Sequence, residues 1–279
     1  MIDGILFVNK PKDMTSRDVV NRVSKIYHTK KVGHTGTLDP LATGVLILCL
    51  GKYTKLVQEL TSEEKEYVVV MKLGYLTDTL DVTGTILKEK KVQVSQERIC
   101  SVFQNFPKEY WQTVPLYSAV KINGKKLYEY ARENEEVELP KRKVQIKNLE
   151  ILKIEKDTIT FKTTVSKGTY IRSLIKDLAS EMQEYGVMQE LTRTKQGNFH
   201  LEDCYDLKDI SENTPLKKLE DLFSYPRVQI TEEIKKRIQN GNVLYLEIDA
   251  PRVLLMNQEN AVAIYEKCDS CYKMVFKVI

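Results

Sequence analysis

The chain has 279 residues, of which 42% are hydrophobic and 29% are charged, and its formal net charge at neutral pH is +4. This composition excludes disordered and fibrous proteins, and the length suits one large domain followed by a small one. The longest apolar run, Val45–Leu50, is far shorter than the roughly 20 residues that cross a bilayer, which excludes a membrane-spanning protein.

A short strand and a capped helix are predicted at the N-terminus. Residues 4–9 have the composition of a strand, which stops before Pro11 because proline disfavours helical backbone in the residue that precedes it. Thr15 and Asp18 have the spacing of a capping box, and apolar residues then recur at helical spacing up to Tyr27. The chain does not start with the basic and apolar segments of a secretory signal, so we expect a cytoplasmic protein.

The next part of the chain combines a loop with buried segments. Residues 31–44 are rich in glycine and threonine and are predicted to be loop, whereas residues 45–50 fit a buried strand or helix segment. Residues 67–73 are predicted to form a strand, and their alternation places Tyr67 on the apolar face.

A further pair of strands precedes the clearest helix of the chain. Residues 78–84 are a polar connection to a strand at 85–87, and residues 144–165 are predicted to form two strands. Residues 171–182 carry one apolar stripe at helical spacing. Arg172 falls on the shoulder of this stripe, which favours a partly buried guanidinium with an anionic partner. The alternative is a surface arginine that extends from the edge of the helix.

The last part of the chain changes character after Pro226. A helix is predicted at residues 231–239, and short strands are predicted around residues 243–245, 252–255, 261–264 and 274–276. Short strands at this spacing are typical of a small β-barrel. We therefore predict two domains, residues 1–226 and residues 227–279.

The five cysteines are scattered and odd in number, which indicates reduced thiols and not a disulfide framework. Cys268 and Cys271 have the spacing of half a zinc site, but no second pair and no nearby histidine follows. We expect no metal, and nothing in the sequence indicates a nucleotide or flavin cofactor.

Basic residues gather in two groups, at residues 121–132 and 141–147, with the acidic run 133–138 between them. On charge alone, a solvated surface and a surface that follows nucleic-acid phosphates are equally compatible with this pattern.

Residues 33–46 form the densest functional signal, with the sequence GHTGTLDPLATGVL. The glycines allow close approach of the backbone, and Pro40 restricts Asp39 to an extended conformation. Such a loop can direct one carboxylate at a ligand, and the alternative is an ordinary structural turn. The glycine spacing and ending of a phosphate-binding P-loop are absent.

This block resembles the signature of the tRNA pseudouridine synthase B (TruB) family, and three further blocks stand in the order expected for that family. These blocks are GILFVNKP at 4–11 with Thr15 and Ser16, VPLYSAVK at 114–121 with GKKLYEYAR at 124–132, and SKGTYIR at 166–172. The resemblance covers most of residues 4–199. One departure is Asp13, which stands where a glycine is expected.

The resemblance implies an enzyme that isomerises uridine 55 in the TΨC loop of tRNA to pseudouridine without a cofactor. It implies an α+β catalytic domain with a mixed, mainly antiparallel sheet and flanking helices, followed by a small PUA-like RNA-binding β-barrel. The implied partner is the TΨC arm of tRNA, and we expect no obligatory protein partner. Because a uridine inside a folded RNA arm is inaccessible, the target base has to be flipped out.

The resemblance also assigns three catalytic positions. Asp39 is the catalytic carboxylate, acting as a nucleophile or as the charge that stabilises an oxocarbenium-like or glycal species. Arg172 is its cationic partner, which keeps a buried carboxylate charged. Tyr67 stacks on the flipped base; without the resemblance, a tyrosine packed in the core is the simpler interpretation.

Five further positions are implied to bind substrate or support the site. His34 helps to hold the flipped RNA loop, and Leu191 forms an apolar wall that keeps water from the separated sugar. Asp81 matches a supporting acidic position, although a loop-capping carboxylate is its independent interpretation. Lys10 and Tyr170 lie inside the matching blocks.

Two rival functions are compatible with the residues. The first is a non-catalytic RNA-binding module, for which Asp39 is dispensable. The second is a carboxylate hydrolase of glycosidic bonds, which requires a second acid, for which Asp78 or Asp81 is available.

Overall fold

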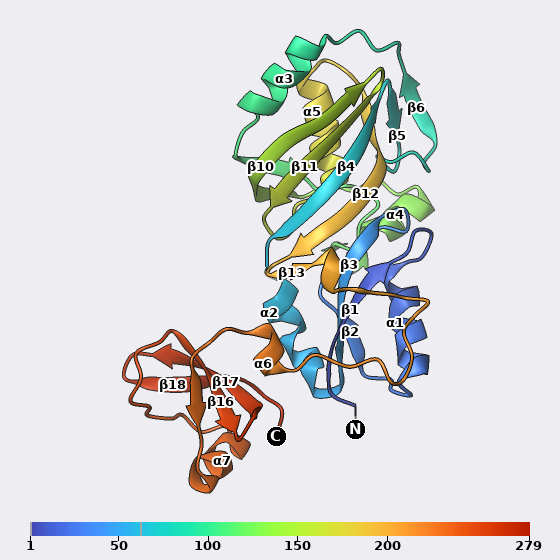
Figure 1. Ribbon diagram of the computed structural model, residues 1–279. Helices are drawn as coiled ribbons and strands as arrows, with labels where there is room; N and C mark the ends of the chain where they lie inside the picture. The colour runs from blue at the N-terminus through green and yellow to red at the C-terminus, as the bar shows by residue number, and fades with distance from the viewer. Residues whose placement is uncertain (1, 62) are drawn as a thin grey trace. The chain divides into compact units, whose positions relative to one another are not determined.

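The computed structural model describes residues 2–61 and 63–279 (Figure 1). The chain divides into two compact units, the first made of residues 1–39, 46–61 and 203–279, and the second of residues 40–45 and 62–202. The predicted boundary after residue 226 separates a catalytic from an RNA-binding domain and differs from this division into compact units. It stays a prediction.

The second unit is built on a sheet whose neighbouring strands are mostly antiparallel. Its strands, in hydrogen-bonded order, are β12 (Gly186–Gln196), β4 (Lys65–Leu73), β11 (Thr158–Val165), β10 (Lys141–Glu155) and β7 (Glu109–Thr113). The first residues of β3 (Thr43–Leu50) pair in parallel with Thr192 and Arg193 of β12, and β13 (Phe199–His200) pairs with the last two residues of β12. Every second residue of β4 is buried, which confirms the predicted alternation and places Tyr67 on the apolar face.

Helices cover one face of this sheet. In Figure 1, α5 (Ile171–Glu181) lies behind the long strands, and α3 (Gln96–Asn105) lies beside them. Phe103 of α3 packs edge-to-face on Phe161 of β11, with ring centroids 5.3 Å apart. The second unit also contains β5 (Tyr75–Thr77), β6 (Ile86–Glu89), β8 (Lys121–Ile122), β9 (Lys125–Lys126) and α4 (Leu127–Glu133). The predicted helix at 171–182 and the strand pair at 144–165 are confirmed.

The first unit pairs β1 with β14 and packs one helix on its strands. Before its C-terminal part, it contains β1 (Gly4–Lys10), α1 (Ser16–Ile26), β2 (Val32–His34), the last part of β3, the 3-10 helix η1 (Gly51–Leu56), α2 (Val57–Thr61) and β14 (Tyr205–Asp206). The 3-10 helix η2 (Leu201–Asp203) spans the point in the chain where the second unit ends and the first resumes. The capping box of Thr15 and Asp18 is confirmed. The prediction that residues 31–44 are all loop was wrong at both ends, because β2 pairs with β3 and β3 already begins at Thr43.

The departure at Asp13 has a local explanation. Asp13 has a φ of 65°, in the left-handed region that favours glycine. Aspartate tolerates this region better than most residues, because its short polar side chain can bond to the nearby backbone. The turn after Pro11 therefore accommodates aspartate at the position where a glycine is expected.

The C-terminal part of the first unit forms a four-stranded sheet with its own apolar core. It contains α6 (Leu219–Leu222), β15 (Arg227–Gln229), α7 (Glu232–Gln239), β16 (Arg252–Asn257), β17 (Asn260–Cys268) and β18 (Cys271–Lys277), and the strands pair in the order β15-β16-β17-β18. The predicted strand at 243–245 was wrong, because Leu244 makes only an isolated bridge to Tyr272.

Within the described residues, no helix combines the length and apolar character needed to cross a membrane.

Candidate active site

The segment that leads into Asp39 is held by a side chain far from it in the sequence. The hydroxyl of Ser16 accepts a hydrogen bond from the main-chain nitrogen of Leu38 at 2.9 Å and donates one to its carbonyl at 3.3 Å. Ser16 is buried at the start of α1, and Asp39 follows Leu38 as a half-buried residue. One hydroxyl therefore fixes both polar main-chain groups of the residue before the predicted catalytic carboxylate.

The segment that follows Asp39 is held by β12. The hydroxyl oxygens of Thr43 and Thr192 lie 2.9 Å apart, and the buried Arg193 donates from Nε to the carbonyl of Val45 at 2.6 Å. Gly44 has a φ of 102°, and a Cβ added there would overlap the carbonyl oxygen of Arg193 and lie 2.8 Å from its nitrogen. Only glycine fits such a close approach of two backbones.

Tyr67 and Leu191 lie on neighbouring strands. Tyr67 of β4 is opposite Arg193, and Leu191 of β12 is opposite Val69, so the two side chains are diagonal neighbours on one face. Both are 6% exposed. The structure thus brings together two of the predicted site residues, the expected stacking ring and the expected apolar wall.

Arg172 is the second residue of α5 and is only 6% exposed, which confirms the prediction that its side chain is partly buried. Its guanidinium donates from Nη1 to the carbonyl of Thr79 at 2.7 Å and from Nη2 to the carbonyl of Tyr117 at 2.9 Å. These two bonds fix the plane of the guanidinium. The expected anionic partner stays a prediction.

Asp81 caps the loop on which Arg172 rests. Its Oδ1 accepts hydrogen bonds from the hydroxyl of Thr79 at 2.9 Å and from the main-chain nitrogen of Thr83 at 2.9 Å. The loop-capping interpretation describes these contacts well. The whole loop is joined to β12, because Val82 donates its main-chain N–H to Met188 at 2.9 Å.

Asp78 has a similar structural task. Its Oδ1 accepts from the main-chain nitrogens of Thr79 and Thr85 at 2.9 and 2.8 Å, and its Oδ2 accepts from the hydroxyl of Tyr117 at 3.1 Å. Burial and the Asp78 charge together raise the pKa of Tyr117, which keeps this hydroxyl a donor. Both acids available to a glycosidic hydrolase are therefore engaged in shaping a loop.

Tyr170 precedes α5 and is anchored by a buried polar chain that the sequence analysis missed. Its main-chain N–H donates to Oε1 of Gln112 at 2.8 Å, and Gln112 donates from Nε2 to the hydroxyl of Tyr110 at 2.7 Å. Tyr110 in turn donates to Asp177 of α5 at 3.0 Å. Burial, reinforced by the Asp177 charge, raises the pKa of Tyr110. The only signal in the sequence was a polar residue at an inward position of a strand.

Lys10 and His34 belong to the first unit. Lys10 is fully buried, and its ammonium donates to the carbonyls of Pro11 and Met14 at 2.8 and 2.6 Å. These bonds give it a structural task in the turn before α1. His34 ends β2 opposite Leu48 and is half-buried. For both residues a contact with substrate stays a prediction.

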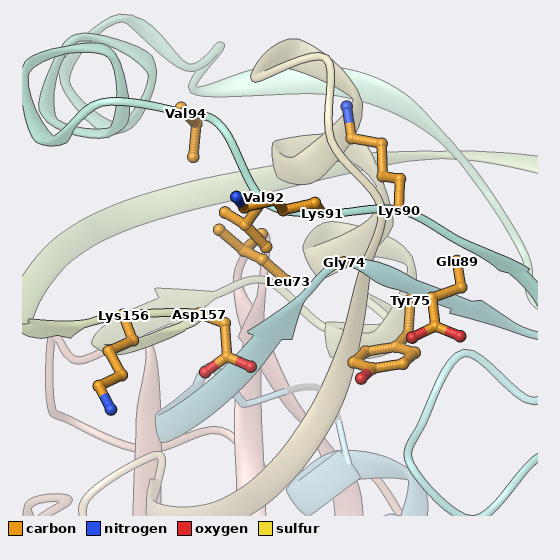
Figure 2. Close-up of a pocket in the computed structure, with 10 residues that line it drawn as sticks. All are labelled: Leu73, Gly74, Tyr75, Glu89, Lys90, Lys91, Val92, Val94, Lys156 and Asp157. Carbon is orange, nitrogen blue, oxygen red and sulfur yellow. The ribbon is translucent and has the colours of Figure 1, made fainter.

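Two hollows of the second unit have none of the predicted catalytic residues in their linings. One, of about 560 Å³, is lined by the ten residues drawn in Figure 2, among them Gly74, Lys90 and Asp157. The other, of about 740 Å³, is lined by residues that include Asp78, Tyr117 and Tyr130. Among the residues that the structure describes, no group of three or more His, Cys, Asp or Glu is placed to hold a metal ion.

Comparison with known proteins places the chain among RNA-modifying enzymes. Residues 24–171 match the family model described as the N-terminal domain of TruB family pseudouridylate synthase. The tRNA pseudouridine synthase B of Clostridium tetani is 41% identical over 98% of this chain and 99% of its own. That of Bacillus pumilus is 40% identical over 99% of this chain and 94% of its own.

Solved structures agree with this relationship. A chain of a Cbf5-Nop10-Gar1 complex is 26% identical, covers 99% of this chain and 84% of its own, and superposes with a TM-score of 0.72. A chain of an H/ACA RNP bound to a substrate RNA that contains 2′-deoxyuridine shares the fold with a TM-score of 0.71, at 24% identity over 99% of this chain and 84% of its own. The predicted fold class is confirmed.

Proposed function

The chain belongs to the TruB family of pseudouridylate synthases, and on this premise we propose that it isomerises uridine 55 in the TΨC loop of tRNA to pseudouridine. The observation that carries the proposal is the 41% identity, over 98% of the chain, to a protein named tRNA pseudouridine synthase B. In the reaction the C1′–N1 bond breaks and a C1′–C5 bond forms, while C5 loses a proton and N1 gains one. The reaction needs neither a redox partner nor an added group.

Asp39 is the proposed catalytic carboxylate. Covalent connectivity supports this role, because Asp39 is four residues before Thr43, which pairs with Thr192 of β12. Four extended residues span at most about 14 Å, so Asp39 cannot lie far from the strand that carries Leu191. The hydrogen bonds of Leu38 on one side and of Val45 on the other restrict the loop between them.

Arg172 is the proposed cationic partner of Asp39. Its two bonds to main-chain carbonyls orient the guanidinium without neutralising its charge. A buried cation needs a negative partner, and a buried carboxylate beside it stays ionised. The carboxylate of Asp39 can serve both chemical routes, attack as a nucleophile and stabilisation of an oxocarbenium-like or glycal species.

Tyr67 and Leu191 are the proposed walls of the pocket that receives the flipped uracil. Their adjacent positions on one face of the sheet support this assignment. Stacking of a base on an aromatic ring contributes roughly 1–3 kcal/mol, which offsets part of the cost of removing the base from its stack. His34, Asp81, Lys10 and Tyr170 are proposed to hold the RNA loop or the protein loops around this pocket.

Residues 227–279 are proposed to act as a PUA-like domain that binds tRNA outside the active site. Their separate apolar core, which includes Ile238, Val253 and Tyr265, supports treating them as a module. Deletion of these residues is expected to weaken tRNA affinity while some turnover remains. Since Phe276 packs on Tyr53, the truncated protein has to be checked for folding by its thermal melting. Undiminished affinity of a folded truncation would refute the assignment.

The function is tested with a tRNA transcript that carries tritium at uridine C5. Wild-type protein is expected to release tritium without free uracil, and Asp39→Asn is expected to reduce the rate by at least about four orders of magnitude, the loss caused by removing the carboxylate of a catalytic triad. Wild-type protein that binds tRNA but releases no tritium would make the chain a non-catalytic RNA-binding module. Liberated uracil would identify a hydrolase of glycosidic bonds.

A further inference from the structure

Trp111 is an exposed aromatic side chain at the edge of the catalytic sheet. It lies on β7, the last strand in the hydrogen-bonded order of the second unit, and 65% of its surface is exposed. It is also the only tryptophan of the chain. Tryptophan is enriched at binding interfaces, because its ring offers a large contact area together with a polar N–H group.

The strand beside Trp111 supplies positive charge. Lys143 of β10 lies directly opposite Trp111, and Lys141, two residues away on the same face, lies opposite Thr113. Both lysines and the nearby Lys108 are exposed. Lys143 forms an ion pair of 2.8 Å with Glu109, but at such exposure an ion pair is readily exchanged for another anion. Aromatic rings among cations are the combination that binds single-stranded nucleic acid.

A hydrogen bond joins the strand of Trp111 to the helix that carries Arg172. Gln112, the next residue of β7, points inward and holds the main-chain nitrogen of Tyr170 at 2.8 Å. Tyr170 lies two residues before Arg172 of α5. A ligand on Trp111 therefore lies one strand position away from the residue that anchors the start of α5.

We infer that Trp111, with Lys141 and Lys143, is a stacking platform for an unpaired base of the substrate RNA, outside the pocket that receives the reacting uridine. The inference rests on the proposed function for the identity of the RNA. The ring provides stacking that tolerates any base, and the two ammonium groups provide contacts to the flanking phosphates.

The sole tryptophan makes the inference directly measurable. The full-length protein is titrated with an unmodified tRNA transcript while tryptophan emission and its quenching by iodide are recorded. Stacking is expected to quench the emission and to protect it from iodide, and a fully paired RNA duplex is expected to do so much less. The Asp39→Asn variant is expected to give the same signal, because the readout does not depend on turnover.

Variants separate the ring from the charges. Trp111→Ala is expected to weaken tRNA binding by about 5- to 100-fold, whereas Trp111→Phe retains a ring and most of the affinity. Lys143→Gln is expected to reduce the slope of log affinity against log salt by about 0.7–0.9. Leu152→Ala is the matched control, because Leu152 is an apolar residue of the neighbouring strand β10 and is 49% exposed.

Three outcomes would overturn the inference. They are an emission that tRNA leaves accessible to iodide, a folded Trp111→Ala that binds as tightly as wild type, and an emission that changes with protein concentration in the absence of RNA, which would identify a contact between copies of the chain. Loss of tritium release with intact quenching would instead overturn the proposed function alone.

Discussion

The sheet of the second unit and the four-stranded C-terminal sheet differ in what they bury. Within residues 2–61 and 63–279, and tyrosines apart, every buried polar or charged side chain precedes residue 197. On the strands of the second unit these side chains include Lys65, Thr163 and Arg193. The interior of the C-terminal sheet is made of residues such as Val253 and Leu255, and its charged groups lie at the surface.

This difference separates two uses of a core. Apolar burial stabilises a fold without directing any single group, whereas a buried polar group has to find its partners in one geometry. Arg193 and Arg172 each hold the main chain of a loop next to a predicted site residue. These buried arginine side chains thus lie in the same unit as the loops that they position next to the predicted site residues.

The largest expected effect comes from Gly44→Ala. The new methyl group would meet the backbone of Arg193, and the φ of 102° disfavours any side chain. We expect a loss of about 3 kcal/mol or more in the free energy of unfolding, measured by urea denaturation. The control in the C-terminal part is Gly241→Ala, where φ is 73° but the nearest atom is 3.5 Å away, so about 1 kcal/mol is expected. Equal losses would contradict the contrast between the two sheets.

Arg193→Lys tests whether the polar interior positions the loop. Lysine keeps the positive charge of Arg193. It lacks the planar guanidinium, so it cannot donate from Nε to the carbonyl of Val45 in the same geometry. We expect kcat to fall by about 10- to 100-fold with a smaller change in KM, since small misplacement of a catalytic group is costly. The counterpart is Arg252→Lys, whose ion pair with Glu266 lies in the C-terminal sheet. If both variants reduced kcat to the same extent, the buried arginine of the second unit would have no special role in positioning the loop.

The smallest effect is a dependence of stability on pH that originates in Lys65. Burial, with the nearby charge of Arg193, lowers the pKa of Lys65 to about 8. Between about pH 8 and 10 the unfolded chain binds more protons at this residue than the folded protein, so stability rises with pH by about 2 kcal/mol. Above this range the buried tyrosines, whose pKa values are raised, reverse the trend.

Urea denaturation at about pH 8 and about pH 10, the two ends of this window, measures the effect. Lys65→Met is expected to remove the rise, and Lys267→Met, at an exposed ion pair of the C-terminal sheet, is expected to leave it intact. A rise that survives in Lys65→Met would assign the effect to another group.

The sequence predicts those parts of the fold that depend on periodicity. The alternation of apolar residues around Tyr67 predicts strand β4, and the apolar stripe before Met182 predicts helix α5. The helical spacing of that stripe also places Arg172 at the edge of the core. The strand Val32–His34 escapes prediction because its stability comes from pairing with β3 and not from its own glycine-containing sequence. The reverse holds for residues 243–245, whose composition favours a strand that finds no continuous partner.

The site is predictable only in part. The position of Asp39 before a proline, in a loop rich in glycine, indicates a directed carboxylate. Ser16 and Arg193 hold the segments on either side of Asp39, and Gln112 holds the start of α5, each across a long stretch of chain through a hydrogen bond. No local pattern encodes such pairs, so they appear only in three dimensions.

The two ties on the Asp39 loop also differ in when they can form during synthesis. The bond from Leu38 to Ser16 spans 22 residues and is available soon after the N-terminal segment leaves the ribosome. The bond from Arg193 to Val45 spans 148 residues and has to wait for most of the protein to be translated. The segments on both sides of Asp39 can therefore be held only after Arg193 has been translated, when nearly all of the second unit exists.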